Sequence, residues 1–142
     1  MVTREEISAV LGEWLEAWKS RDAVSLAAKY SEDGVYTSML ADTIRGRQAI
    51  ESLYRSWFSA FPDMVFEVES LVIEGELAAI LWSQRGRHLG DFCGLAGTGR
   101  SFLLHGVFFM ALNEGQIISM RSIYDFTGLL LQVGVLKAKP AM

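Results

Sequence analysis

Four polar residues in the last third of the chain have types and spacing suited to acid–base chemistry: His105, Ser119, Arg121 and Asp125. They lie in two segments of alternating polarity, 102–112 and 116–126, which are joined by Asn113-Glu114-Gly115 as a predicted hairpin. Residues that face each other across a hairpin project to the same side, so symmetric pairing about Glu114 brings all four onto one face. His105 then lies diagonal to Asp125, about 7–8 Å away between backbones. An imidazole and a carboxylate in a dry pocket can transfer protons near neutral pH, so we expect both to point into an enclosed hollow.

Each of these residues also has an ordinary structural explanation. His105 can be a hydrogen-bonded core histidine, Asp125 a carboxylate that starts a helix near Thr127, and Arg121 its surface ion-pair partner. Their occurrence on one face favours a site over three separate explanations. We therefore predict Asp125 as the acid/base, with His105 and Arg121 as orienting or oxyanion-stabilising groups.

The neighbouring predicted strand, 77–88, and the helices supply candidate ligand-binding residues. Arg85 joins the face of His105 if this strand pairs in matching register, whereas a slip of one residue brings His88 there instead. Aromatic side chains on helical faces are core residues or line a cavity between helices and sheet. The predicted ligand-binding set is Trp14, Trp18, Tyr36, Tyr54, Trp57, Arg85 and His88.

The opposite face of the predicted hairpin is strongly apolar. It consists of Phe102, Leu104, Phe108, Met110, Ile118, Met120, Tyr124 and Phe126. Helices can cover only one face of a sheet, and we expect them on the side of His105. We therefore expect this apolar face to pack against a second subunit in a homodimer.

The elements that must position these residues follow from periodicity and capping signals. Thr3 and Glu6 have capping-box spacing before a helical apolar stripe, Asp22 precedes a second short helix, and a third runs from about Arg47 to Pro62. Residues 31–34 read as a turn before a short strand at 35–37, and 64–73 and 77–88 as a hairpin. Thr127 is expected to cap a final helix over 128–133, ahead of a flexible tail at 135–142. This order predicts one α+β domain over residues 1–142, in which helices cover one face of an antiparallel sheet.

Composition narrows the classes of function. The 142 residues are 51% hydrophobic with a net charge of −4, and Lys and Arg form no run, so nucleic acid is not an expected partner. No apolar stretch is long enough to span a membrane, and the polar start of the chain does not resemble a secretory signal, so we expect a cytoplasmic protein. The single cysteine, Cys93, is expected to be a loop residue.

Neither phosphate nor metal binding is supported by a motif. Residues 94–101 have the glycine spacing of a phosphate-binding loop, but Arg100 replaces the lysine and a strand follows rather than a helix. The two histidines, His88 and His105, lack a ligand-like spacing, so no metal is expected.

Several short motifs are distinctive in combination. They are Arg87-His88-Leu89-Gly90-Asp91-Phe92-Cys93-Gly94, Gly97-Thr98-Gly99-Arg100, and Gln132-Val133-Gly134 after Asp125, with shorter matches at 44–50, 60–63 and 114–117. In these motifs, and over most of residues 5–134, the chain resembles the SnoaL-like polyketide cyclases, also called the ester cyclase family. The resemblance implies an NTF2-like cone, a curved mixed or antiparallel sheet wrapped around amino-terminal helices, usually dimeric through the sheet and without metal or organic cofactor.

The resemblance also implies a reaction and a site. In characterised cyclases an aspartate is the acid/base of an intramolecular aldol ring closure on an apolar carbonyl compound, and Asp125 matches its position. His88 matches a histidine at the mouth of the cavity. Arg121 stands where many members have tryptophan, and it could bind an enolate oxygen or neutralise Asp125.

Alternatives on the same fold are a ketosteroid-type isomerase, an epoxide hydrolase built on an Asp–Arg–Asp arrangement, and a binding or assembly module without chemistry. The module predicts an Arg121–Asp125 salt bridge and a filled cavity. An open cavity that reaches Asp125 favours an enzyme.

Overall fold

The first part of the chain forms helices where the sequence predicts them. The computed structural model describes residues 2–137, and in it α1 spans Arg4–Lys19, α2 spans Ala23–Ala28 and α3 spans Arg47–Ala60. The capping box at Thr3 is present, and Asp22 caps α2 through the amide of Ser25. Both predicted caps are thus confirmed.

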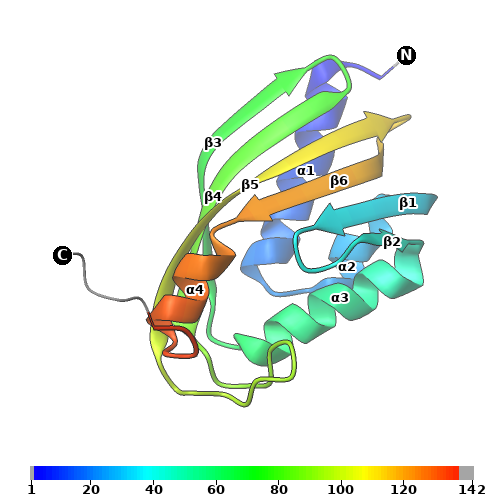
Figure 1. Ribbon diagram of the computed structural model, residues 1–142. Coiled ribbons are helices and arrows are strands. Elements are labelled where there is room, and N and C mark those ends of the chain that lie inside the picture. Colours follow the sequence, from blue (N-terminus) through cyan, green and yellow to red (C-terminus); the bar gives the residue numbers. More distant parts are fainter. Residues whose placement is uncertain (1, 138–142) are drawn as a thin grey trace.

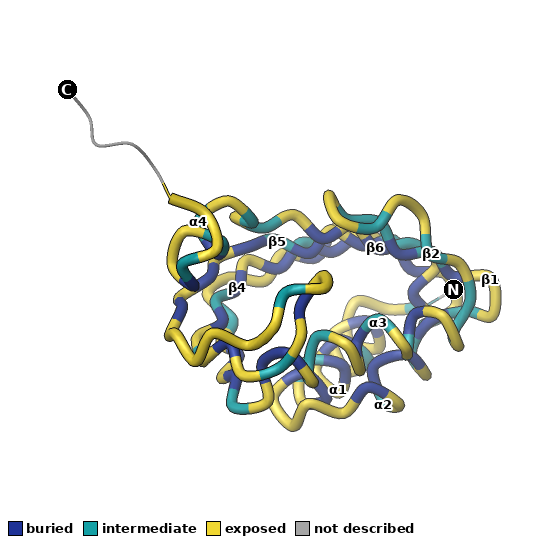
Figure 2. Tube along the Cα trace, turned by 60° about the horizontal axis from the view of Figure 1, so that its bottom comes forward, coloured by how far each residue is buried: buried dark blue, intermediate teal, exposed yellow. Residues whose placement is uncertain are grey.

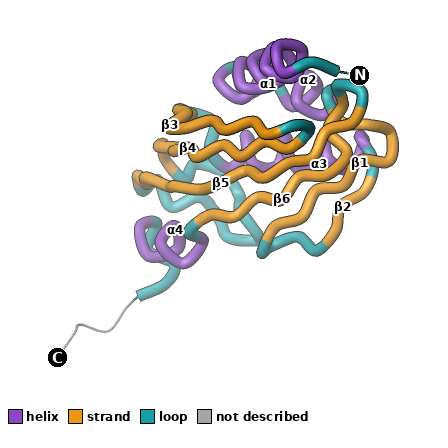
Figure 3. The backbone as a smooth tube through the Cα atoms, turned by 90° about the horizontal axis from the view of Figure 1, so that it is seen from above, coloured by secondary structure: helices purple, strands orange, loops and turns teal. Residues whose placement is uncertain are grey.

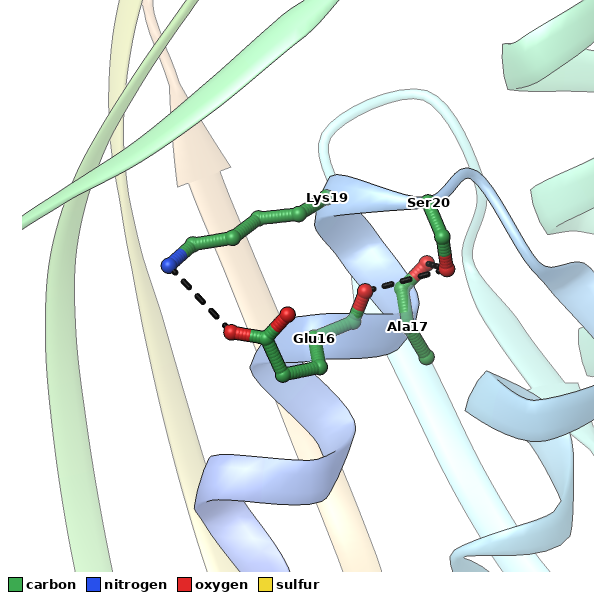
Figure 4. A network of polar contacts seen from close by, with 4 residues as sticks. All are labelled: Glu16, Ala17, Lys19 and Ser20. Carbon is green, nitrogen blue, oxygen red and sulfur yellow. Dashed lines mark hydrogen bonds and ion pairs between the residues drawn. The ribbon is translucent and has the colours of Figure 1, made fainter.

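The end of α1 is closed by its own side chains (Figure 4). Ser20 Oγ donates to the Glu16 and Ala17 carbonyls at 3.0 and 3.4 Å, and the Lys19 ammonium lies 3.4 Å from the Glu16 carboxylate. The same two carbonyls also accept backbone hydrogen bonds, from the Ser20 and Asp22 amides at 2.9 Å each, so each of them accepts two hydrogen bonds. The chain can then turn sharply into α2.

Six strands form one curved mixed sheet, ordered β2-β1-β6-β5-β4-β3. Their bounds are Tyr30–Ser38 (β1), Thr43–Arg45 (β2), Val65–Glu74 (β3), Leu77–Arg87 (β4), Ser101–Asn113 (β5) and Gln116–Tyr124 (β6). All neighbours pair antiparallel except β1 and β6, which run parallel. Helices α1, α2 and α3 lie against one face, and α4, Phe126–Gln132, lies at the end of the sheet beyond β6 (Figures 1 and 3). The expected α+β architecture, with the sheet wrapped around amino-terminal helices, is confirmed.

Two local predictions were wrong, and one strand was missed. Residues 31–34 continue strand β1 rather than forming a turn, because β1 pairs with β6 through an irregular register between Tyr30 and Val35. The short edge strand β2 had no alternating pattern to reveal it. The cap of α4 is Asp125, two residues before the predicted Thr127, and its carboxylate accepts from the Gly128 amide at 2.9 Å.

The carboxyl-terminal segment stays close to α4 as far as the structure describes it. The amides of Val135 and Leu136 both donate to the Leu130 carbonyl, at 3.0 and 3.1 Å. The remainder of the predicted tail, residues 138–142, lies outside the described residues.

The core lies between the helices and the concave face of the sheet (Figure 2). The apolar stripe of α1 contributes Ile7, Leu11, Trp14 and Trp18, and the facing strand positions include Ile80, Trp82, Phe108 and Met110, all buried. Burial of these large side chains is the main stabilising contribution, at about 25 cal/mol per Å² of apolar surface. The strongly apolar face of the predicted hairpin is therefore the one that the helices cover, and the expectation that a second subunit covers this face is wrong.

Candidate active site

Of the predicted acid–base residues, His105 and Arg121 lie on the convex, outer face of the sheet, and Asp125 follows the end of β6 as the N-cap of α4. His105 has a side chain 57% exposed, and its Nδ1 lies 3.1 Å from the Glu69 carboxylate. Arg121, paired across the hairpin with Phe109, is exposed as well. Asp125 is exposed and accepts the Gly128 amide hydrogen bond. The expectation that His105 and Asp125 point into an enclosed hollow is therefore wrong.

The physical reason is a competition between the two faces of one hairpin. The face with Phe102, Leu104 and Phe108 buries far more apolar surface against the helices than the face with His105 could. Strand alternation then forces His105 and Arg121 outward. Ile118, predicted on the apolar face, is also outside, because a bulge between Ala111 and Leu112 shifts the pairing of β5 and β6.

The predicted shared face itself is correct. Ser83 pairs with His105 and Arg85 with Leu103, so Arg85 joins the His105 face as the matching register requires. Arg85 is exposed there and forms an ion pair with Glu67 at 2.9 Å. No salt bridge joins Arg121 to Asp125 within residues 2–137. The ion pair expected of a non-catalytic module is thus not found, and neither is the acid–base pocket expected of an enzyme.

A pocket does exist on the inner side, between α1, α3 and the concave face of the sheet. It is partly open, and the space free of protein atoms, including its mouth, is about 340 Å³. The residues that line it are Trp18, Tyr36, Leu53, Tyr54, Trp57, Trp82, Gln84, Phe108, Ser122 and Tyr124. Mostly apolar walls with a few polar groups are typical of small-molecule sites.

Four of the predicted ligand-binding residues line this pocket, namely Trp18, Tyr36, Tyr54 and Trp57. The other three do not. Trp14 is fully buried behind Trp18 and Phe108, and Arg85 lies on the outer face. His88 is 1% exposed and packs beside Phe61 and Phe92 rather than at a pocket mouth.

His88 fixes the loop between β4 and β5. Its Nδ1 lies 3.1 Å from the Thr98 hydroxyl, and its backbone bonds Gly99 and Arg100. Its Nε2 is buried without a hydrogen-bond partner in the described part of the chain. The loop places Phe92 against Trp57 and Phe61, so the motif that carries the family resemblance supports a pocket wall from behind.

Tyrosine hydroxyls are the most numerous polar groups around the pocket. The Tyr54 and Tyr30 hydroxyls lie 2.7 Å apart, and Tyr36 lies beside Ser122. Burial raises the pKa of Tyr30, Tyr36, Tyr54 and Tyr124 above the ordinary tyrosine value, because the charged phenolate loses its hydration. All four therefore remain neutral hydroxyl groups at physiological pH.

Sequence reasoning missed six lining residues, the apolar Leu53, Trp82 and Phe108 and the polar Gln84, Ser122 and Tyr124. Gln84 is 1% exposed, and its carbonyl oxygen accepts the Trp57 indole N–H at 2.8 Å. Within residues 2–137 its amide nitrogen makes no hydrogen bond, so the group can donate to a ligand. The available signal was parity, because Gln84 shares the strand face of Trp82, and Ser122 and Tyr124 that of Met120.

Neither a carboxylate nor an imidazole is among the described lining residues. Over residues 2–137, no three His, Cys, Asp or Glu side chains come close enough together to hold a metal ion. The same part of the chain has no helix of the length and hydropathy needed to cross a bilayer. The pocket thus offers hydrogen-bond donors and aromatic surface rather than charged groups.

Comparison with known proteins identifies the family and the fold. The family model of SnoaL-like polyketide cyclases matches residues 8–133. AclR, a candidate hydroxylase from Streptomyces galilaeus, is 25% identical over 97% of this chain and 87% of its own, with a TM-score of 0.84. IdmH, a candidate polyketide cyclase from Streptomyces antibioticus, is 27% identical over 90% of this chain and 98% of its own, with a TM-score of 0.76.

More distant structures show the fold alone. A Catenulispora acidiphila protein with a ketosteroid-isomerase-like fold is 17% identical over 92% of this chain and 97% of its own, with a TM-score of 0.77. A search of curated proteins found no match. Because the family model covers almost the whole described chain, the protein belongs to the SnoaL-like polyketide cyclase family and has the NTF2-like α+β fold.

Proposed function

We propose that this protein binds a neutral, largely apolar compound bearing carbonyl oxygens in the aromatic pocket and promotes its ring closure by cyclase-type chemistry. The observation that carries the proposal is the set of neutral donors on aromatic walls: the hydroxyls of Tyr36, Ser122 and Tyr124 and the amide of Gln84. A donor-rich site without charge suits carbonyl oxygens better than carboxylates or ammonium groups. Family membership supports the reaction class.

The donors would act on the oxygens where charge develops. In an intramolecular aldol closure, a carbon beside a carbonyl loses a proton, the resulting enolate carbon bonds to a second carbonyl carbon, and that carbonyl oxygen becomes an alkoxide that takes up a proton. Tyr36 and Tyr124 would donate to the enolate and alkoxide oxygens, since burial raises the pKa of both and keeps them protonated. Each such donor is worth about 2.7–4 kcal/mol in comparable sites.

The proposed reaction also needs a base that removes the carbon-bound proton. Asp125 follows the lining residue Tyr124 and stays our candidate base on family resemblance. Its carboxylate would have to leave the Gly128 amide and turn inward to reach a ligand. His105 and Arg121 face the other side of the sheet and are proposed only to influence Asp125 from outside.

Binding and proton transfer can be tested with 1-tetralone, a two-ring ketone with exchangeable α-protons. We expect it to quench tryptophan fluorescence, and Tyr36→Phe to weaken binding about tenfold through loss of one hydrogen bond. Ser25→Ala, on α2 outside the pocket, serves as a control. Unchanged affinity in the Tyr36 variant would contradict the proposed role of the donor wall, which consists of Tyr36, Gln84, Ser122 and Tyr124.

Catalysis is separated from binding by NMR of α-proton exchange in D₂O. We expect exchange faster than in buffer alone, and slower with Asp125→Asn than with the wild type. Binding without accelerated exchange would favour a ligand-binding module, the second candidate, which is supported by the lack of acidic or basic groups among the described lining residues. The isomerase and epoxide-hydrolase alternatives also need carboxylates that the lining lacks, and the family match does not support them as it supports the cyclase.

We also propose a homodimer through the outer face of the sheet. Six large apolar side chains there are 39–55% exposed: Leu77, Leu81, Leu103, Phe109, Ile118 and Ile123. They lie on the neighbouring strands β4, β5 and β6, flanked by the Glu67–Arg85 and Glu69–His105 pairs. An apolar patch with a polar rim is typical of a protein interface.

A further inference from the structure

The pocket is narrow for the ligands its family membership suggests. Only about 30 Å³ of it is wide enough to hold the centre of a water molecule. An aromatic ligand can therefore enter only if one of the side chains that line the pocket moves. The question is which side chain sets that limit.

The Trp82 ring occupies the space that a side chain at residue 106 would fill if this residue were not glycine. Trp82 pairs across β4 and β5 with Gly106, and Gly106 pairs with Tyr124 on β6, so these positions form a row on the concave face. A Cβ atom at residue 106 would lie 2.2 Å from Trp82 Cζ2 and 2.7 Å from Cη2. The six-membered ring of the indole thus lies over the glycine.

Two neighbours exclude a side chain at residue 106: the Trp82 ring and, at 2.8 Å from the position of a Cβ atom, the Ile123 carbonyl oxygen. Gly106 is not among the glycines with positive φ, so its conformation is open to other residues. Glycine is needed for the space that it leaves above the sheet. Gly106 and Trp82 thus pack as one unit, in which the glycine leaves room for an indole that lines the pocket.

The Trp82 ring is held by packing and not by a hydrogen bond. Its Nε1 is buried and has no partner among residues 2–137, whereas the Trp57 Nε1 donates to Gln84. Phe108, Phe66 and Tyr124 surround it, with ring centroids 5.0, 6.1 and 6.4 Å away. Trp18, the other lining indole without a bond, is held by stacking on both Phe66 and Phe108 from helix α1.

We infer that Trp82, laid over Gly106, is the specificity-determining wall that limits the size of the ligand in this pocket. The inference rests on the proposed function, because it concerns the same pocket. Replacing Trp82 by phenylalanine removes volume above Gly106 and breaks no hydrogen bond within the described chain. The change is therefore steric and should act on ligand size alone.

The test compares neutral ketones of increasing size: 1-tetralone with two fused rings, anthrone with three and benzanthrone with four. Dissociation constants are measured by quenching of the remaining tryptophans. We expect Trp82→Phe to raise the affinity for benzanthrone relative to 1-tetralone about tenfold. Trp14→Phe is the matched control, since Trp14 also has an unpartnered Nε1 and is fully buried but does not line the pocket.

The outcomes separate this inference from the proposed function. One outcome is that 1-tetralone binding depends on Tyr36 while the size preference is the same in the wild type, Trp82→Phe and Trp14→Phe. This would overturn the size-limiting role of Trp82 and leave the donor wall in place. Absence of binding by all three ketones to both the wild type and Trp82→Phe would overturn both. An equal shift in Trp14→Phe would show general loosening of the core and would also overturn the role of Trp82.

Discussion

At the scale of single residues, the chain gathers all four of its tyrosines around one pocket. A buried hydroxyl is stable when it is hydrogen-bonded, as in the pair formed by Tyr30 and Tyr54. Burial also raises the pKa of each, so these groups remain donors. The same effect ties the stability of the fold to pH.

Stability is predicted to fall above about pH 10, the ordinary tyrosine pKa. Below that pH the tyrosines are protonated in both states, and the contribution to stability is fully present. As pH rises past it, the unfolded chain releases protons that the native state retains, so the free energy of unfolding decreases by up to about 1.4 kcal/mol per pH unit for each such tyrosine. Urea unfolding at pH 8, 9, 10 and 11 measures this.

Tyr54→Phe provides the comparison for that slope. It removes one buried phenol and should flatten the decline above pH 10, although it leaves Tyr30 without its partner and lowers stability at pH 8. A decline as steep as in the wild type would show that the buried tyrosines are not its cause.

At the scale of elements, α4 depends on the cap that Asp125 provides. Asp125→Ala should reduce the free energy of unfolding by about 1 kcal/mol, because the Gly128 amide loses its acceptor, whereas Asp125→Asn should cost a few tenths. Urea unfolding of both variants tests this. Equal losses in the two variants would mean that the carboxylate charge matters rather than the cap. This is also why Asp125→Asn suits the proton-exchange experiment, since the helix should remain folded.

The contact between β4 and β5 at Gly106 is the second element with a defined cost. Gly106→Ala should destabilise the protein by roughly 1–3 kcal/mol, because its Cβ overlaps the Trp82 ring. Adding Trp82→Leu should recover part of that loss and not all of it, since the carbonyl of Ile123 also lies 2.8 Å from the added atom. Thermal unfolding of the two single variants and the double variant measures the coupling. Strictly additive effects would contradict the overlap.

At the scale of the whole molecule, the sheet has one face covered by its own helices and one left bare. Ile123→Glu, at the most exposed apolar position of the proposed interface, should convert the proposed dimer into a monomer while 1-tetralone binding persists, because the pocket lies on the other side. Light scattering after gel filtration measures the mass. Val24→Glu, an equally exposed apolar position on α2, is the control. A wild type that is monomeric at micromolar concentration would refute the dimer.

Helices, strands and fold class were predictable because they depend on local signals. Capping residues at Thr3 and Asp22, the end of α3 before Pro62, and the alternation in β4, β5 and β6 were all confirmed in the structure. The parity of Arg85 with His105 was also correct. Short-range periodicity determines which residues share a face, because side chains alternate strictly along a strand.

What the sequence alone determined, then, is the set of elements and the two groups of side chains on opposite faces of the last hairpin. Only the tertiary structure decided which group faces inward. The tryptophans and phenylalanines of the helices are buried together with those of the strands. This packing places Tyr36, Gln84 and Ser122 around the pocket and leaves His105, Arg121 and Asp125 outside. Periodicity shows which residues share a face but not which face is buried. Burial of the larger apolar area determines that.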